Sequence, residues 1–372
     1  MPSKIFIVFF LFGFGQNIFS DALIERPIEN RNLYLPFLLF LEPYPTTPKT
    51  LEKGKMSIDS GMAISNMIDN NNAPVDYGSN YSTYKPLYWS YYSKEYADGS
   101  LTPNTYYLSE LLTYGRLEQQ SHVRIDAEIQ RFHTKLSYGL FKNFEIGLDI
   151  SALSYNTGIF DRPITGFHRT VGIPYPLRDI YSDNQFGFHI TDNMKYVVKG
   201  KLGTSLGDSV LDAKWKLREQ NGWLPTLAWI NSVKIPTGNT NLSMGTGKPD
   251  LATGISSKWN FDYYFVFVNL FGIIPSDPFN SREIHVKPFA ALSSTLGYTF
   301  TEKFSVVGQF EIKGSPYHSA IRLLNQTAVL LSFGLNWKVF PSCALRVNFT
   351  EDPITRSVPD VSVQTSLLCL KE

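Results

Sequence analysis

Apolar and polar residues alternate with a period of two along most of this chain. Between residues 144 and 152, Phe144, Ile146 and Leu148 alternate with Glu145 and Asp149. Successive side chains of a β-strand point to opposite faces, so this segment predicts a strand with one apolar and one charged face. The same alternation recurs at residues 210–218, 304–313, 329–339 and 343–350.

The alternating segments and the turn signals between them predict twelve strands. We place these at residues 56–68, 131–140, 144–156, 207–218, 225–236, 250–261, 263–274, 287–300, 304–313, 327–340, 343–351 and 360–370. Short connections between them alternate with long ones, which is typical of membrane β-barrels with short periplasmic turns and long outer loops. Ten or fourteen strands remain open, because residues 186–200, which we place in an outer loop as a hairpin, would otherwise add two strands.

Hydropathy and composition favour a membrane barrel. After the N-terminus the chain has no apolar run of about 18 residues, so we expect no transmembrane helix. A protein that crosses a membrane without helices must close its strands into a barrel, because only closure pairs every backbone polar group in lipid. Charged residues are 18% of the chain and aromatic residues 15%, which fits a lipid-facing surface with aromatic girdles. A soluble sandwich alternates in the same way, but the large aromatic faces favour an all-β, antiparallel transmembrane β-barrel with long external loops.

The first residues have the features of a secretory signal peptide. Lys4 supplies a positive charge, residues 5–14 form a short apolar stretch, and Ser20 and Ala22 flank a cleavage site. An uncleaved N-terminal anchor is the alternative. We expect a signal peptide at residues 1–22, an N-terminal periplasmic segment at 23–55 and the barrel at 56–372. The expected location is the outer membrane of a Gram-negative-type envelope, with outer-membrane lipid and the barrel assembly machinery as partners.

The polar faces of the predicted strands identify the side chains that would line the pore. The charged ones are Arg131, Lys135, Glu145, Asp149, Asp212, Lys214, Lys216, Arg218, Lys234, Lys258, Glu311, Lys338 and Arg346, with Asp59 and Lys313 on the same parity. Ten of these are basic and five acidic, which favours an interior that prefers anions, since charged rings set the ion preference of a pore. The alternative is that opposite charges pair and only hold the inner wall together.

The long connection at residues 157–183 has the features of a short helix, with Asp161 as its N-cap. Ile164, Phe167 and His168 would share one face of that helix. Such a helix could fold into the mouth of the barrel and narrow the pore, or it could simply cover the outside.

A second long connection, at residues 68–130, is rich in tyrosine between Tyr77 and Tyr96. Loops of this length are usually functional or disordered. The tyrosines could stack on sugars or serve as a recognition surface, or they could pack the loop onto the barrel rim.

The chain contains two cysteines, Cys343 and Cys369. The first opens the eleventh predicted strand and the second lies near the end of the twelfth, so both lie near the periplasmic end with lipid-facing parity. Antiparallel neighbours in an oxidising periplasm permit a disulfide. Two unpaired thiols are equally compatible with the sequence.

Motifs for catalysis are absent from the sequence, which contains no Cys-x-x-Cys, Gly-x-Ser-x-Gly, His-Glu-x-x-His or phosphate-binding loop. We therefore predict no enzyme activity, no metal and no cofactor. The net charge of +1 argues against a nucleic-acid partner. A barrel-type lipid hydrolase is the enzymatic alternative, but His133 and Ser137 are four residues apart on one strand, which is too far for a direct hydrogen bond.

Several short motifs stand out from the alternating background. They are Asp126-Ala127-Glu128, Tyr138-Gly139-Leu140, Glu145-Ile146-Gly147-Leu148, Phe160-Asp161, Gly166-Phe167-His168, Gly172-Ile173-Pro174, Leu206-Gly207-Asp208, Leu211-Asp212-Ala213-Lys214, Lys234-Ile235-Pro236-Thr237-Gly238 and Gly245-Thr246-Gly247. Together they resemble a bacterial family of predicted outer-membrane barrels that is known only as a domain of unknown function. The motifs from Leu206 onward are also similar to outer-membrane barrels associated with aromatic degradation.

The resemblance covers roughly residues 50–370 and implies a barrel and an outer-membrane address, but no substrate and no catalytic residues. The chain departs from the usual pattern at its end. Outer-membrane barrels usually finish on an aromatic residue, whereas this chain finishes with Leu370-Lys371-Glu372.

The function predicted from these features is a passive or weakly selective outer-membrane channel for small solutes. The alternatives are a structural or surface-recognition barrel with a filled lumen, and a barrel-type lipid hydrolase.

Overall fold

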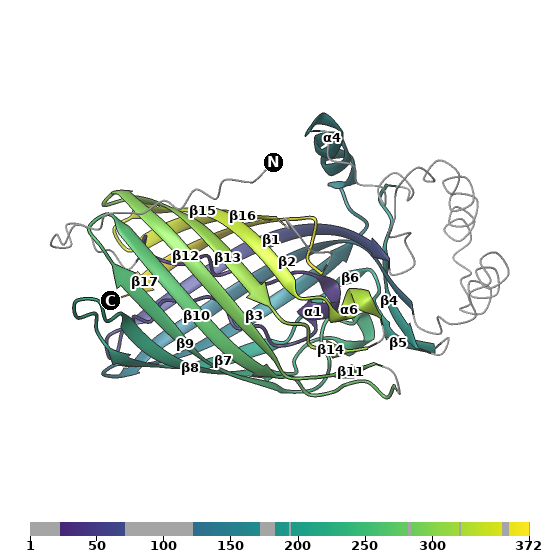
Figure 1. Ribbon diagram of the computed structural model, residues 1–372, viewed down its shortest axis with the longest axis horizontal. Helices are drawn as coiled ribbons and strands as arrows, with labels where there is room; N and C mark the ends of the chain where they lie inside the picture. Colours follow the sequence, from purple (N-terminus) through teal and green to yellow (C-terminus); the bar gives the residue numbers. More distant parts are fainter. Residues whose placement is uncertain are drawn as a thin grey trace, which may run out of the picture.

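The main element of the fold is a closed antiparallel β-barrel of twelve strands (Figure 1). The computed structural model describes residues 23–70, 122–171, 183–192, 195–281, 284–319, 321–351 and 357–371. In chain order the ring consists of β1 (Met56–Asn70), β2 (His122–Phe141), β3 (Phe144–Asn156), β7 (Ser209–Arg218), β8 (Thr226–Ile235), β9 (Asp250–Asn260), β10 (Tyr264–Ile274), β12 (Phe289–Thr301), β13 (Phe304–Lys313), β15 (Ala328–Phe340), β16 (Cys343–Glu351) and β17 (Val361–Lys371). β17 pairs with β1 and closes the ring, which confirms the predicted barrel of twelve strands.

Side-chain exposure alternates along the strands, with apolar residues facing outward. In β12, Leu292 and Leu296 are 41% and 50% exposed, while Thr295 between them is 0% exposed. The exposed positions of the other strands are likewise large and apolar, among them Leu270, Phe310 and Phe333. An apolar exterior and a polar interior are what a barrel in lipid requires.

The two ends of the barrel differ in their connections. At the turn end the strands are joined by short turns, such as Lys142 and Asn143 between β2 and β3, where Asn143 adopts a φ of 64°. β1 begins and β17 finishes at this end. At the loop end the connections are long and contain the small elements α4 (Asp161–Val171), β4 (Gly187–Asp192), β5 (Lys195–Lys199), β6 (Gly203–Leu206), η1 (Thr240–Leu242), β11 (His285–Val286), β14 (Tyr317–His318) and α6 (Arg322–Asn325).

The first part of β2 extends beyond the ring and pairs with β4, and β4 pairs with β5. The hairpin predicted within residues 186–200 therefore lies outside the ring and adds no barrel strand. β2 starts at His122, nine residues before the predicted start at residue 131. Residues 123–129 do alternate between apolar and polar side chains, but the phase changes near Arg131, and the predicted strand begins only there. All seven residues are buried, so both faces of this part of the strand pack against other residues.

The helix predicted from the Asp161 cap is present as α4. The Asp161 carboxylate accepts a hydrogen bond from the backbone N–H of Asn184 at 2.7 Å and from Asn66 Nδ2 at 2.9 Å. α4 projects away from the barrel wall (Figure 1). None of the helices in the described ranges is long and apolar enough to cross a membrane.

β16 and β17 are joined covalently as well as by their ladder. Cys343 lies opposite Cys369 in the register of the two strands, near the turn end. A disulfide joins their Sγ atoms.

Residues 23–51, which the sequence predicts as part of a periplasmic segment, lie inside the barrel. Residues 23–48 are buried except for the half-buried Arg26, Arg31 and Leu38. We call residues 23–51 the plug. It contains one short helix, α1 (Leu35–Leu38).

Candidate functional site

The plug crosses the lumen twice. Its first arm, residues 23–33, begins at the turn end, where Asn336 Nδ2 donates to the carbonyl oxygen of Ile24 at 2.9 Å. The chain turns at the loop end through the tip, residues 34–41, which includes α1. The returning arm, residues 42–51, reaches the turn end again, where the Leu51 N–H donates to Glu145 at 2.8 Å. Both arms therefore end at the turn end of the barrel.

Polar side chains of the wall hold the first arm. Lys258 Nζ lies 2.6 Å from Glu25 Oε2 near the turn end. Gln309, halfway along β13, accepts the N–H of Ile28 at 3.0 Å and donates to the carbonyl oxygen of the same residue at 2.9 Å. The first arm does not pair with any strand of the described sheets, so its buried peptide groups need other partners. The Gln309 side chain supplies a donor and an acceptor for the peptide groups of Ile28.

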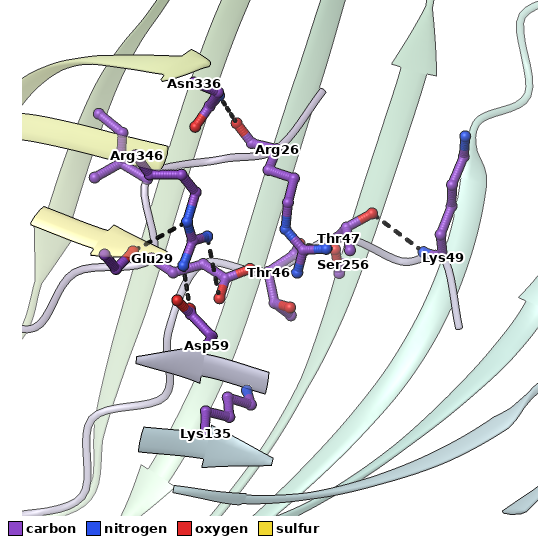
Figure 2. Close-up of polar contacts among 12 residues, drawn as sticks. Arg26, Glu29, Thr46, Thr47, Lys49, Asp59, Lys135, Ser256, Asn336 and Arg346 are labelled. Atoms are coloured by element: carbon purple, nitrogen blue, oxygen red, sulfur yellow. Dashed lines mark hydrogen bonds and ion pairs between the residues drawn. The ribbon is translucent and has the colours of Figure 1, made fainter. Parts of the chain in front are cut away.

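Arg346 of β16 lies between two carboxylates, one on the plug and one on the wall (Figure 2). Its Nη1 atom lies 3.6 Å from Glu29 Oε2 of the first arm, and its Nη2 atom pairs with Asp59 of β1. All three side chains are at most 7% exposed. A buried charge without a partner is costly, so this cation stabilises the seated plug together with the wall.

Asp149 of β3 joins both arms to the wall. Its Oδ2 atom lies 2.9 Å from Arg131 Nη2 of β2 and 3.2 Å from Arg31 Nη2 of the first arm. The same atom accepts the hydroxyl of Tyr44 from the returning arm. The Arg31 guanidinium also lies 4.9 Å from the centroid of the Tyr44 ring, a cation–π contact between the two arms.

Further contacts fix the returning arm. Glu42 accepts the N–H of Asn32 at 3.0 Å and pairs with Lys313 of β13, so it connects the two arms and the wall. Nearer the turn end, Ser256 Oγ donates to the carbonyl oxygen of Thr46 at 2.6 Å.

The tip is apolar and packs into an apolar cluster at the loop end. Phe37 and Phe40 contact the ring of Tyr317 in β14, with centroids 6.2 Å and 5.5 Å away. The Tyr317 hydroxyl donates to the carbonyl oxygen of Pro36 at 2.8 Å. Burial raises the pKa of Tyr317 well above its ordinary value, so this hydroxyl remains a donor. The tip thus closes the mouth of the barrel by apolar packing, whereas ion pairs hold the two arms in the lumen.

Ten of the thirteen predicted pore-lining residues point into the lumen and are ion-paired there. They are Arg131, Lys135, Glu145, Asp149, Asp212, Lys214, Lys234, Lys258, Glu311 and Arg346. The remaining three, Lys216, Arg218 and Lys338, lie near the turn end. Lys216 and Lys338 keep the inward parity of Lys214 and Asn336 and are half-buried. Arg218 is exposed, and it follows the register shift that comes after Lys216.

The ion-paired charges of the lumen wall are balanced in the described part of the chain. The cations among them are Arg131, Lys135, Lys214, Lys234, Lys258, Lys313 and Arg346, and the anions are Asp59, Glu145, Asp149, Asp208, Asp212, Asp250 and Glu311. Most of these pair with one another, for example Lys135 with Asp212 at 3.1 Å and Lys214 with Glu145 at 2.9 Å. The arrangement agrees with the predicted alternative in which opposite charges hold the wall together, and the predicted excess of basic residues is smaller than the sequence implied.

A small cavity remains between the returning arm and the wall. It is lined by Tyr44, Lys135, Glu145, Asp212 and Lys214, among others. A polar cavity of this kind suits water rather than an apolar ligand.

The predicted constriction by α4 remains a prediction. Ile164 is half-buried, and the side chains of Phe167 and His168 lie outside the described residues. The part of the chain that narrows the described lumen is the plug. The tyrosine-rich stretch from Tyr77 to Tyr96 also lies outside the described residues.

The model of a protein family described as "Protein of unknown function (DUF3187)" matches residues 93–368. The chain belongs to this family. The matched range contains every barrel strand from β2 onward, up to residue 368 in β17, whereas the plug and β1 precede it. A comparison with curated proteins gives no significant match. Membership of the DUF3187 family therefore assigns no substrate.

Solved structures similar to this DUF3187 barrel include outer-membrane proteins. The COG4313 outer membrane channel from Pseudomonas putida F1 has a TM-score of 0.52 and 11% identity, over 89% of this chain and 100% of that chain. The P. putida toluene transporter TodX has a TM-score of 0.35 and 8% identity, over 86% and 89%. An active-site mutant of outer membrane phospholipase A from Escherichia coli has a TM-score of 0.31 and 7% identity, over 90% and 96%. The first likeness supports the fold, and the other two scores are too low to argue from.

Proposed function

We propose that this chain is an outer-membrane channel for small solutes that its own plug holds closed. The observation that carries the proposal is a closed barrel whose polar lumen is filled by a segment of the same chain. Described contacts between the plug and the wall are non-covalent, as in the pairs of Glu25 with Lys258 and of Glu29 with Arg346. A lumen lined with charged and hydroxyl groups can be hydrated once the plug leaves.

The path of the plug favours movement towards the turn end. Both arms end there, and residue 51 continues directly into β1, which begins at Met56. The hydrogen bonds between Gly54 and Gly139 and between Gly139 and Lys55 hold this connection against β2. The tip can therefore leave the mouth while the chain near β1 stays attached, and we propose that the turn end is the periplasmic side.

The expected secretion route belongs to the same proposal. We propose that residues 1–22 are cleaved as a signal peptide, that the barrel assembly machinery inserts the chain, and that outer-membrane lipid surrounds it. The apolar outward faces of the strands support a lipid environment.

A structural barrel with a permanently filled lumen is the second candidate, because the described lumen is occupied along its whole length by buried plug residues. Solute flux into proteoliposomes separates the two. The channel proposal predicts slow swelling with the full mature chain and fast swelling with a variant that lacks residues 23–51. A variant lacking residues 162–170 of α4 is the matched control and should behave as the full chain. Equal swelling rates for the full chain and the variant without residues 23–51 would favour the filled barrel.

A further inference from the structure

Two charged wall residues contact the main chain of the tip on either side of Phe40. Lys234 Nζ donates to the carbonyl oxygen of Leu39 at 2.7 Å, and Asp250 Oδ2 accepts the N–H of Leu41 at 2.8 Å. Lys234 is 2% exposed and Asp250 is 1% exposed. Main-chain hydrogen bonds that flank one residue give affinity for a peptide, while a pocket for the residue between them gives specificity.

Phe40 itself occupies a slot of aromatic rings. Its centroid lies 5.5 Å from that of Tyr317 and 6.2 Å from that of Phe279, with interplanar angles of 85° and 81°. Both contacts are edge-to-face, the favourable arrangement for aromatic pairs. Lys234 Nζ lies 5.6 Å from the Phe40 centroid, which adds a cation–π contact.

The polar half of this site is built without the plug. Lys234 Nζ lies 3.2 Å from Asp208 Oδ2 and 2.9 Å from Thr246 Oγ1. The other oxygen of Asp250 accepts the N–H of Ser276 at 2.8 Å. Lys234 and Asp250 thus have contacts with the wall and its loops that remain when the tip leaves, so the site is largely preorganised. Three motifs that the sequence analysis singled out, those containing Asp208, Lys234 and Thr246, meet here.

We propose that Lys234, Asp250, Phe279 and Tyr317 form a binding site for a short apolar peptide with an aromatic residue, and that residues 39–41 are its resident occupant. The site requires two peptide groups and one ring together, which a hydrocarbon or a sugar does not supply. The inference rests on the proposed function, because a peptide bound from outside would displace the tip and open the mouth.

A test must take account of the tethered tip. A segment on a short linker has an effective concentration in the millimolar range, so a free peptide competes poorly with it. We would therefore use a blank-tip variant in which residues 36–41 are replaced by glycine and serine in equal number. The probe is the labelled, acetylated and amidated pentapeptide with the sequence of residues 38–42, measured with the barrel in nanodiscs.

The proposal predicts saturable one-to-one binding of this pentapeptide to the blank-tip variant. Replacing the phenylalanine of the peptide by alanine, or introducing Lys234→Met into the variant, should weaken binding at least tenfold. A peptide of scrambled sequence controls for partition into lipid, and Lys216→Met controls for loss of a cation at the turn end. Gel mobility before and after boiling verifies that each barrel is folded.

Equal binding of the scrambled peptide, or no saturable binding to a folded blank-tip variant, would overturn the peptide site. Should that variant not fold, the full-length Phe40→Ala protein replaces it, and the expected result is at least tenfold tighter binding than to the unaltered chain. Failure of the proposed function is recognised separately. If a variant that lacks the whole plug does not conduct, the channel proposal is contradicted, independently of the peptide result. If that variant conducts but the blank-tip variant does not bind the peptide, only the peptide site is contradicted.

Discussion

At the scale of single residues, buried charges determine how the plug is held. Asp149 contacts Arg131 of the wall, Arg31 of the first arm and Tyr44 of the returning arm. Such a network stabilises one geometry only while every member has its partner, because a partly satisfied buried network is worse than an apolar core. The lumen of this barrel is therefore sensitive to the removal of one charge.

Arg346 gives the first prediction. Arg346→Leu leaves Glu29 and Asp59 buried with one counter-ion fewer, so we expect the free energy of unfolding to fall by about 3–5 kcal/mol. Urea unfolding followed by tryptophan fluorescence measures the change. Arg218→Leu removes an exposed arginine at the turn end and should change the same quantity by no more than about 0.5 kcal/mol. An equal effect of the two substitutions would contradict the role given to Arg346.

Tyr317 gives the second prediction. Tyr317→Phe leaves the buried carbonyl oxygen of Pro36 without its donor, which should cost about 1–3 kcal/mol of stability. The pKa of Tyr317 is higher in the folded state than its ordinary value of 10.0. Its contribution is therefore complete below pH 10 and is lost as the pH rises above that value.

The measurement for Tyr317 is the free energy of unfolding at pH 8 and pH 11. The unaltered protein should lose more stability between the two values than Tyr317→Phe does. Tyr263→Phe is the control, since Tyr263 is 40% exposed near the turn end. An identical pH dependence in all three proteins would show that Tyr317 does not hold the tip in the way described.

At the scale of elements, the strands could be predicted because each one separates lipid from a polar lumen. Alternation identifies β3 and β12 directly, since a strand between two such environments must alternate. Parity is interrupted at the end of β7, where the ladder shifts register between Lys216 and the exposed Arg218. A bulge has no reliable signature in a single sequence, so Arg218 could not be placed.

The plug could not be predicted from alternation. Its arms are neither strands nor amphipathic helices, and their hydrogen bonds go to wall side chains such as Gln309 and Ser256. The apolar residues 33–41 are too few to span a bilayer, and on their own they indicate only burial. The sequence signal was the spacing of Glu25, Glu29 and Glu42, which has meaning only once the opposing cations Lys258, Arg346 and Lys313 are placed in space.

The β16–β17 hairpin gives the third prediction. The disulfide between Cys343 and Cys369 spans 26 residues, and a loop of this length should stabilise the fold by about 3 kcal/mol. We expect the Cys343→Ser, Cys369→Ser double variant to convert from the folded to the unfolded gel band at a lower temperature. Reductant should lower that temperature for the unaltered protein and leave the double variant unchanged. An unaltered protein that is insensitive to reductant would contradict this role of the disulfide.

At the scale of the whole molecule, different interactions hold the plug in the lumen and at the mouth of the barrel. The arms contact a charged wall, as Glu25 and Arg31 do, whereas the tip packs Phe37 and Phe40 into an apolar cluster. Ion pairs weaken with salt when they become hydrated, whereas apolar packing does not. The tip should therefore be the part that keeps the plug seated at high ionic strength.

The balanced wall gives the fourth prediction. The ion-paired charges of the described wall are seven cations and seven anions, and most of them pair with one another rather than with residues 23–51. We expect a reversal potential close to zero across a tenfold gradient of potassium chloride, because neither ion is favoured by the net charge. A strong preference for chloride would instead support the excess of basic residues that the sequence alone suggested.

The central claim is that the plug closes a channel, and single-channel conductance in planar lipid bilayers tests it most directly. The full mature chain and the variant without residues 23–51 are compared at the same protein concentration, after both have been verified as folded by their heat-dependent gel mobility. We expect rare, small openings for the full chain and stable, larger conductance for the variant. A folded variant that conducts no better than the full chain would contradict a plugged channel and leave a barrel whose filled lumen serves a structural or recognition role.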